Sequence, residues 1–203
     1  MVRRLPQFFE ALGRAPVIAA VRRPGEFEAA LAKGLEVIFI LGEDIFYLRE
    51  AAKDGRRRGK IVLAHIDLIK GVGKDEAGVR LLKEVWGVEG ILTTRANLVA
   101  SARKEGLIAV QRLFVLDSDS LGLGLESVLK TAPDAFEILP GLIFPKIADR
   151  LRDPALPRVL AGGLIRHPAE VDEILAAGAV GISTSTQALW GYGAGAGGRA
   201  NSP

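Results

Sequence analysis

The stretch AGGLIRHPAEVDEILAAGAVGISTST, residues 161–186, decides the fold. Two glycines follow a short apolar run, a helical pattern extends from Pro168 to Gly178, and a second apolar run ends in four consecutive hydroxyl residues. An apolar run, a helix and another apolar run are typical of two parallel strands joined by a helical crossover. The stretch therefore predicts two parallel strands, the first ending in glycines and the second in hydroxyl groups.

The same alternation extends along the whole chain. Eight apolar runs lack polar alternation, as expected for strands covered on both faces; they are residues 17–21, 36–41, 60–67, 89–93, 107–113, 135–139, 158–162 and 180–184. Proline near the start and glycine past the end mark helical stretches between them, as at Pro24 and Gly34. We predict an α/β fold, a single TIM-like (β/α)8 barrel. An open doubly wound sheet is the alternative, because one sequence does not reveal the order of the strands.

The domain organisation that we predict is simple. Residues 1–190 form one barrel domain that binds a ligand, and residues 5–13 form a short helix that covers the bottom of the barrel. Residues 191–203 are rich in glycine and alanine, which predicts a flexible tail.

Composition excludes several classes of site. The chain has 203 residues, of which 49% are hydrophobic and 25% charged, as in a well-filled globular domain. Because cysteine is absent, disulfides, thiolate nucleophiles and cysteine-based zinc sites are excluded. The two histidines, His65 and His167, fall in different predicted loops, so we expect no metal site and no cofactor. We find neither a signal-peptide pattern nor an apolar run of ~20 residues, so we expect a cytoplasmic protein without a membrane partner.

The charge pattern is mildly basic. A net charge of +3 is compatible with a polyanionic partner but does not require one. The basic run Arg56–Arg58 has two interpretations. It is either the solvated last turn of a helix, where cations complement the helix dipole, or part of a nucleic-acid surface.

Polar residues collect where the predicted strands end, and ligands of parallel α/β folds bind at those ends. The candidate ligand-binding residues are Asp67, Lys70, Lys74, Arg112, Glu137, Lys146, Gly162, Gly163, Ser183, Thr184 and Ser185. Glycines let a backbone approach a ligand closely, and free amides that open a helix attract an anion. We therefore predict a phosphate site after strands seven and eight. The alternative is that the glycines only form a tight turn and the hydroxyls only cap a helix.

Two carboxylates fall within this predicted rim. Strand alternation places Asp67 on the inner face with His65, and it places Glu137 on the inner face within the apolar stretch AFEILP. A carboxylate buried alone is strongly unfavourable, so Glu137 must meet Arg112, Lys146 or ligand hydroxyls. Cations for a phosphate and carboxylates for hydroxyls together favour a compact phosphorylated polyol.

The chain resembles the family of glycerol uptake operon antiterminator regulatory proteins. The stretches that carry the resemblance, in order, are PVIAAV, VIFIL, HIDLIKGVGKDE, GILTTRANL, QRLFVLDS, DAFEILPG, AGGLI, GISTS and the closing LW, over about residues 8–190. The resemblance implies a barrel that binds sn-glycerol 3-phosphate as an effector. It also implies binding to the 5′ leader of a messenger RNA, which prevents early termination of glycerol-utilisation genes.

The resemblance also implies roles for the residues selected above. Those near the phosphate are Lys70, Lys74, Arg112, Lys146, Gly162, Gly163, Thr184 and Ser185, whereas Asp67 and Glu137 lie near hydroxyls. On this interpretation the protein is a regulator without catalytic residues, either as a monomer or as a homo-oligomer. The alternative is an isomerase- or lyase-type enzyme that acts on a phosphorylated sugar or polyol. In that enzyme His65, Asp67, Lys70 and Glu137 would supply acid, base or Schiff-base chemistry.

Overall fold

The fold is a closed barrel of eight parallel strands in a computed structural model that describes residues 4–194. The strands are β1 (Val17–Val21), β2 (Val37–Ile40), β3 (Ile61–His65), β4 (Gly90–Thr93), β5 (Ile108–Phe114), β6 (Ala135–Leu139), β7 (Arg158–Gly162) and β8 (Gly181–Thr184). Each strand pairs with its neighbour in sequence, and β1 pairs with β8, with Ala19 opposite Thr184. This last pairing confirms the (β/α)8 barrel and excludes the open sheet.

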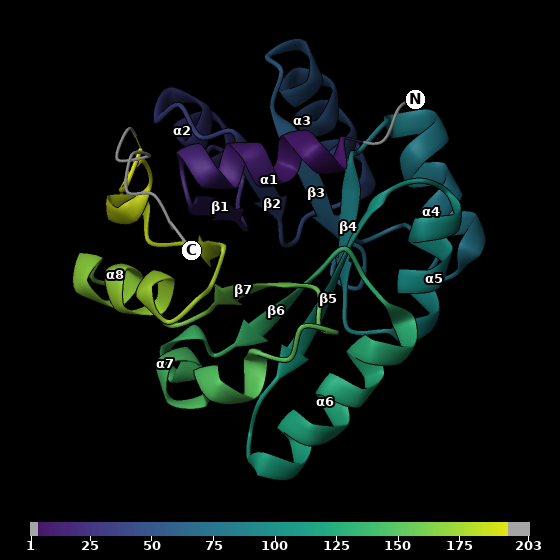
Figure 1. The fold of residues 1–203 in the computed structure, drawn as a ribbon. Coiled ribbons are helices and arrows are strands. Elements are labelled where there is room, and N and C mark those ends of the chain that lie inside the picture. Colours follow the sequence, from purple (N-terminus) through teal and green to yellow (C-terminus); the bar gives the residue numbers. More distant parts are fainter. Residues whose placement is uncertain (1–3, 195–203) are drawn as a thin grey trace.

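Helices surround the strands (Figure 1). They are α1 (Leu5–Arg14), α2 (Glu26–Ala32), α3 (Ile45–Arg57), α4 (Glu76–Leu81), α5 (Ala96–Lys104), α6 (Ser118–Thr131), α7 (Phe144–Ile147) and α8 (Pro168–Ala176). Shorter helical turns are the π-helical η1 (Leu82–Trp86) and the 3-10 turns η2 (Gly141–Ile143), η3 (Ala148–Leu151) and η4 (Gln187–Leu189). None of the helices within residues 4–194 is long and apolar enough to span a membrane.

The predicted N-terminal helix closes the bottom of the barrel. Phe8 and Leu12 of α1 are buried in the inner core cluster together with strand residues such as Leu63. Arg4, which precedes α1, donates hydrogen bonds to the carbonyls of Gly59 and Lys60 at 3.0 and 3.1 Å, just before β3 begins. Helix α1 therefore lies at the amino ends of the strands, opposite the edge where the candidate residues were predicted.

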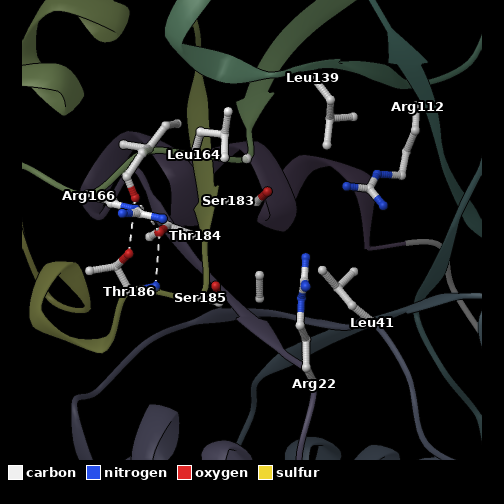
Figure 2. A pocket seen from close by; sticks show the side chains of 13 residues that line it. Arg22, Leu41, Arg112, Leu139, Leu164, Arg166, Ser183, Thr184, Ser185 and Thr186 are labelled. Carbon is white, nitrogen blue, oxygen red and sulfur yellow. Dashed lines mark hydrogen bonds between the residues drawn. The ribbon is translucent and has the colours of Figure 1, made fainter.

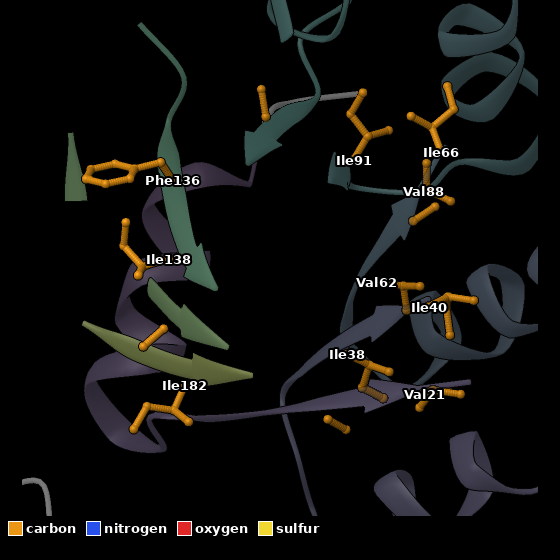
Figure 3. Packing of buried hydrophobic residues seen from close by; sticks show 14 of the residues in the cluster. Val21, Ile38, Ile40, Val62, Ile66, Val88, Ile91, Phe136, Ile138 and Ile182 are labelled. Carbon is orange, nitrogen blue, oxygen red and sulfur yellow. The ribbon is translucent and has the colours of Figure 1, made fainter. Parts of the chain in front are cut away.

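The core has two layers, as strand alternation requires. On β2, Phe39 belongs to the inner cluster, whereas Ile38 and Ile40 belong to the outer cluster between strands and helices. Figure 3 shows part of this outer layer, with Ile38 and Ile40 beside Val62. On β6 the same alternation turns Phe136 outward, and it places Glu137 among inward-facing residues, as the sequence predicted.

The C-terminal segment continues past the barrel as a turn. Tyr192 in this turn donates its hydroxyl hydrogen to Asp172 on α8, with an O–O distance of 2.8 Å. Residues 195–203 of the predicted tail lie outside the described residues, so the flexibility of the tail stays a prediction.

Candidate functional site

A cavity of about 270 Å³ opens at the carboxyl ends of the strands (Figure 2). It is lined by residues that follow or end β1, β2, β5, β6, β7 and β8, namely Ala20, Arg22, Leu41, Arg112, Leu139, Gly163, Leu164, Ile165, Arg166, Ser183, Thr184, Ser185 and Thr186. The predicted residues that the cavity brings together are thus Arg112, Gly163 and the three hydroxyl residues from Ser183 to Ser185.

Three arginines supply the charge of the cavity, and its lining contains no acidic residue. In Figure 2, Arg22 and Arg112 approach the cavity from opposite sides, and Arg166 lies near Thr184. Arg112 forms an ion pair with Glu137, whereas the side chains of Arg22 and Arg166 form no ion pair with a carboxylate within residues 4–194. Two guanidinium groups at this rim, those of Arg22 and Arg166, are therefore free of ion pairs within residues 4–194.

Glu137 lies beneath the cavity and is fully buried. Its Oε2 accepts a hydrogen bond from Nε of Arg112 at 2.6 Å, and its Oε1 accepts one from the Ser183 hydroxyl. Of the partners that the sequence left open, Arg112 is therefore the cation that meets Glu137. The pair compensates the buried carboxylate and fixes Arg112, whose side chain is only 8% exposed, at the floor of the cavity.

The two glycines at the carboxyl end of β7 have different roles. A Cβ atom on Gly162 would overlap the Glu137 carboxylate and the Ser183 hydroxyl, so Gly162 is required by close packing. Gly163 lines the cavity with a φ of +82°, a backbone conformation that residues other than glycine rarely adopt. Leu164 follows, also with a positive φ of +65°, and its side chain is exposed. Two consecutive residues with positive φ, Gly163 and Leu164, therefore line the cavity just after β7.

Most of the hydroxyls at the carboxyl end of β8 already have partners. Ser183 binds Glu137, while the hydroxyls of Thr184 and Thr186 both donate to the carbonyl of Ile165, at 3.0 and 3.1 Å. These bonds join the loop after β8 to the loop after β7. Ser185 is exposed, and its hydroxyl has no partner within residues 4–194. None of these hydroxyls caps η4, so the capping alternative does not explain them.

Backbone amides remain available at the same place. Within residues 4–194 no group accepts a hydrogen bond from the N–H of Gly163, Leu164, Ile165 or Ser185. Free amides at a turn with positive φ form a concave site that favours anions. The residues that line the cavity therefore hold two guanidinium groups without an ion pair, four backbone amides without an acceptor and one free hydroxyl within residues 4–194.

Asp67 lies in a separate cluster at the ends of β3 and β4. Its Oδ2 accepts hydrogen bonds from the Thr93 hydroxyl at 2.8 Å and the Thr94 amide at 3.1 Å, and its Oδ1 is 3.0 Å from Nε of Arg95. His65 lies below it, with Nδ1 3.7 Å from Oδ2 of Asp67. Asp67 does not line the cavity, because these partners hold it within its own loops.

Burial, together with the nearby Arg112 guanidinium, lowers the pKa of His65 to about 4. The native state therefore favours neutral His65, while the unfolded chain takes up a proton near pH 6.5. The free energy of unfolding should be undiminished above pH 6.5 and should fall as the pH drops toward 4. One pH unit in this window corresponds to about 1.4 kcal/mol, so the loss between pH 6.5 and pH 5 is about 2 kcal/mol.

Denaturant unfolding of the wild type and of His65→Asn at pH 7.5 and pH 5 measures this effect. The variant should lose the part of the pH dependence that His65 contributes, while its other groups titrate as before. An equal decrease in both proteins between the two pH values would contradict this assignment.

The three predicted lysines lie away from the cavity lining. Nζ of Lys74 donates to the carbonyls of Ile66 and Ile69, the latter at 2.6 Å, and so closes the loop after β3. Lys70 is exposed, and its backbone joins the loop to α3 through bonds of 3.0 Å with Glu43 and Ile45. Lys146 is exposed on α7. A role for these lysines in binding a ligand stays a prediction.

Sequence reasoning did not select Arg22 and Arg166, although a repeated motif marks both. The two copies are VRRPGEF at residues 21–27 and IRHPAEV at residues 165–171. In each copy the glutamate accepts two backbone N–H groups: Glu26 bonds Arg22 and the next residue at 2.7 and 3.2 Å, and Glu170 bonds Arg166 and the next residue at 2.7 and 3.0 Å. The motif thus orders the turn that carries each arginine at the rim.

Metal binding has no support in the described part of the chain. Among residues 4–194, no group of three or more His, Cys, Asp or Glu side chains is arranged to hold a metal ion.

Comparisons with known proteins agree with the geometry. The chain is 33% identical to a glycerol uptake operon antiterminator-related protein from Thermotoga maritima MSB8, with 86% of this chain and 96% of that chain covered and a TM-score of 0.76. The glycerol uptake operon antiterminator regulatory protein from Listeria monocytogenes str. 4b F2365 is 30% identical, with 87% and 95% covered and a TM-score of 0.77. The uncharacterized protein YgcP from Escherichia coli K12 is 31% identical over 179 residues, which are 88% of this chain and 93% of that protein.

A family model extends the agreement over most of the barrel. Residues 17–190 match the family described as glycerol-3-phosphate responsive antiterminator. The match covers every strand from β1 to β8 and all the residues that line the cavity. The resemblance that the sequence motifs carry is thereby confirmed, and the chain belongs to the glycerol-3-phosphate-responsive antiterminator family.

Proposed function

We propose that the cavity binds sn-glycerol 3-phosphate and that the complex binds the leader of a messenger RNA. The observation that supports the first part is that Arg22, Arg166 and the residues with free amides after β7 and β8 line one cavity. A phosphate monoester carries a charge of about −1.5 to −2 at pH 7. The two guanidinium groups that form no ion pair within residues 4–194, those of Arg22 and Arg166, therefore match the charge of one phosphate.

The size and chemistry of the cavity favour a small ligand. Its volume of about 270 Å³ is below the range of roughly 300–1,000 Å³ that is usual for drug-sized ligands. The unpaired Ser185 hydroxyl and Arg112 are available to ligand hydroxyl or phosphate oxygens, and Leu41 and Leu139 supply apolar wall for a carbon chain. A three-carbon phosphorylated polyol fits this combination.

Membership of an antiterminator family supports RNA as the second partner. A ligand changes the affinity for RNA only if it favours the state that binds RNA. Binding linkage is reciprocal, so RNA must raise the affinity for the ligand by the same factor. Typical coupling free energies correspond to about 5- to 150-fold.

Measurements of both affinities test this proposal. We expect glycerol 3-phosphate to tighten binding of a leader transcript of glycerol-utilisation genes by about 5- to 150-fold, and the transcript to tighten ligand binding equally. Glycerol and inorganic phosphate at the same concentration are the controls. A transcript affinity that is the same with and without glycerol 3-phosphate would contradict the regulatory part, and product formed during long incubation would favour the enzyme instead.

A further inference from the structure

A second hollow of about 480 Å³ lies on the outside of the barrel, between α3 and η1. It is lined by Arg49, Glu50, Lys53, Arg56, Arg57, Val85 and Trp86, and we call it the α3–η1 groove. Helix α3 belongs to the outer ring of helices (Figure 1). None of the residues of this groove lines the cavity at the barrel mouth, so the two sites are distinct.

The groove has a basic wall. The spacing of Arg49, Lys53 and Arg57 is four residues, which places them along one side of α3 over about 12 Å. One acidic residue, Glu50, lines the groove beside four cations. Lys53 forms no hydrogen bond or ion pair within residues 4–194. This arrangement gives the groove a net positive charge.

The ion pairs at the groove are exposed and exchangeable. Arg57 is 2.7 Å from Asp54, and Arg49 is 3.1 Å from Glu50. Exposed pairs of this kind typically contribute ~0–1 kcal/mol, so a phosphate can replace their partners at small cost. The last turn of α3 is therefore solvated, which agrees with one of the two interpretations of the basic run Arg56–Arg58. Its cations are still available to bind a polyanion.

The opposite wall supplies apolar and aromatic surface. Val85 is 65% exposed, and the partly buried Trp86 lines the groove next to it. Arg56 donates a hydrogen bond to the carbonyl of Gly87, which joins the end of α3 to the end of η1. A row of cations beside an aromatic side chain is what single-stranded nucleic acids bind, with phosphates on the cations and a base stacked on the ring.

We propose that the α3–η1 groove is a binding surface for single-stranded RNA. Lys53 and Arg57 contact phosphates, and Trp86 stacks on a base. The inference rests on the proposed function for the choice of RNA, while the groove itself is defined by its charge and its aromatic side chain. The same helix begins near the mouth, because Asp44, which caps α3, follows Leu41 of the cavity by three residues.

The test compares three variants with the wild type in binding to a labelled leader transcript of glycerol-utilisation genes, with glycerol 3-phosphate present. In Lys53→Gln/Arg57→Gln we expect affinity to fall about tenfold near 0.15 M salt. The slope of log K against log salt should decrease by about 1.4, since each contact to a single strand contributes ~0.7. Trp86→Leu should lose about 5- to 150-fold, the range for one stacked base, with little change in that slope.

The matched control is Lys130→Gln/Arg152→Gln. Lys130 is exposed on α6, and Arg152 is 3.0 Å from Asp149, much as Arg57 is paired with Asp54. The control removes the same charge from another side of the barrel, and we expect near wild-type RNA affinity. Circular dichroism melting of each variant verifies that it is folded.

The outcomes separate this proposal from the proposed function. If the groove variants bind the transcript like the wild type, while RNA binding by the wild type responds to glycerol 3-phosphate, the α3–η1 groove is not the RNA-binding surface. The proposed function would be unaffected by that result. A wild type that binds no transcript with ligand present would overturn both. An equal loss of RNA affinity in the control variant would show only general charge attraction, and it would also refute RNA binding at the α3–η1 groove. Unchanged RNA binding with lost binding to vesicles of acidic phospholipid would assign the groove to membranes instead.

Discussion

Glu137→Ala is expected to lower the free energy of unfolding by about 3–5 kcal/mol, because it leaves the Arg112 guanidinium buried without its carboxylate. The variant also removes the acceptor of the hydrogen bond from the Ser183 hydroxyl. Ser183 and Arg112 both line the cavity. Denaturant unfolding at pH 7.5 measures the loss. We expect the midpoint to move with little change in the slope, as for a barrel that keeps its overall fold.

Two further variants identify the cause of this loss. Arg112→Met/Glu137→Leu replaces the whole pair by apolar side chains, and it should recover much of the stability because no buried charge remains unpaired. Asp149→Ala removes the carboxylate of an exposed pair with Arg152 and should change the free energy of unfolding by less than about 1 kcal/mol. A loss below about 1 kcal/mol for Glu137→Ala would refute the buried pair as a source of stability.

Arg22→Gln and Arg166→Gln are each expected to weaken glycerol 3-phosphate binding by about 10- to 150-fold. A charge-assisted hydrogen bond typically contributes ~1.5–3 kcal/mol, and about 1.4 kcal/mol corresponds to a factor of ten. Because both arginines are exposed and unpaired within residues 4–194, their loss should leave the melting temperature of the free protein nearly unchanged. Calorimetric titration of the folded variants measures the change in affinity.

Arg23→Gln is the matched control for these two substitutions. Arg23 is exposed and follows Arg22 directly, but it does not line the cavity. We therefore expect an affinity within about twofold of the wild type, the range of screened long-distance attraction. If Arg23→Gln and Arg22→Gln weaken binding equally, the arginines act through general charge and do not contact the phosphate.

The fold could be predicted from the sequence because its signal is repeated eight times. The strands at 17–21, 135–139 and 158–162 were predicted with their observed bounds, and the others were within one or two residues. Continuous apolar runs bounded by glycine and proline are typical of a buried parallel sheet. The order of the strands and the closure of the sheet were undetermined, since the pairing of Ala19 with Thr184 joins residues at opposite ends of the chain.

The candidate site was predicted only in part. Alternation correctly placed Glu137 inside the barrel, and the need to compensate a buried charge led to Arg112 as one of two candidate cations, with ligand hydroxyls as the other possibility. The roles of the hydroxyls were less predictable, because the Ser183 hydroxyl donates to Glu137 and the Thr184 hydroxyl donates to the carbonyl of Ile165. Hydrogen-bond partners on distant strands cannot be seen in a local pattern.

Loop residues were the hardest to place. Strand alternation ends where a strand ends, so it does not predict the direction of the Lys70 or Lys74 side chain. In the structure the backbone of Lys70 bonds to the start of α3, and Nζ of Lys74 donates to carbonyls of its own loop. Arg22 and Arg166 also follow strands, but each belongs to a motif in which a glutamate three or four residues later bonds two backbone amides. That repeat is the signal in the sequence that would have identified them.

A crystal structure of the protein with sn-glycerol 3-phosphate tests the central claim most directly. We expect one phosphate in the cavity after β7 and β8, within hydrogen-bond distance of the amides of Gly163 and Ser185 and of the guanidinium groups of Arg22 and Arg166. A phosphate bound instead by Lys70 and Lys74 at the other side of the mouth, or no bound ligand at saturating concentration, would contradict it.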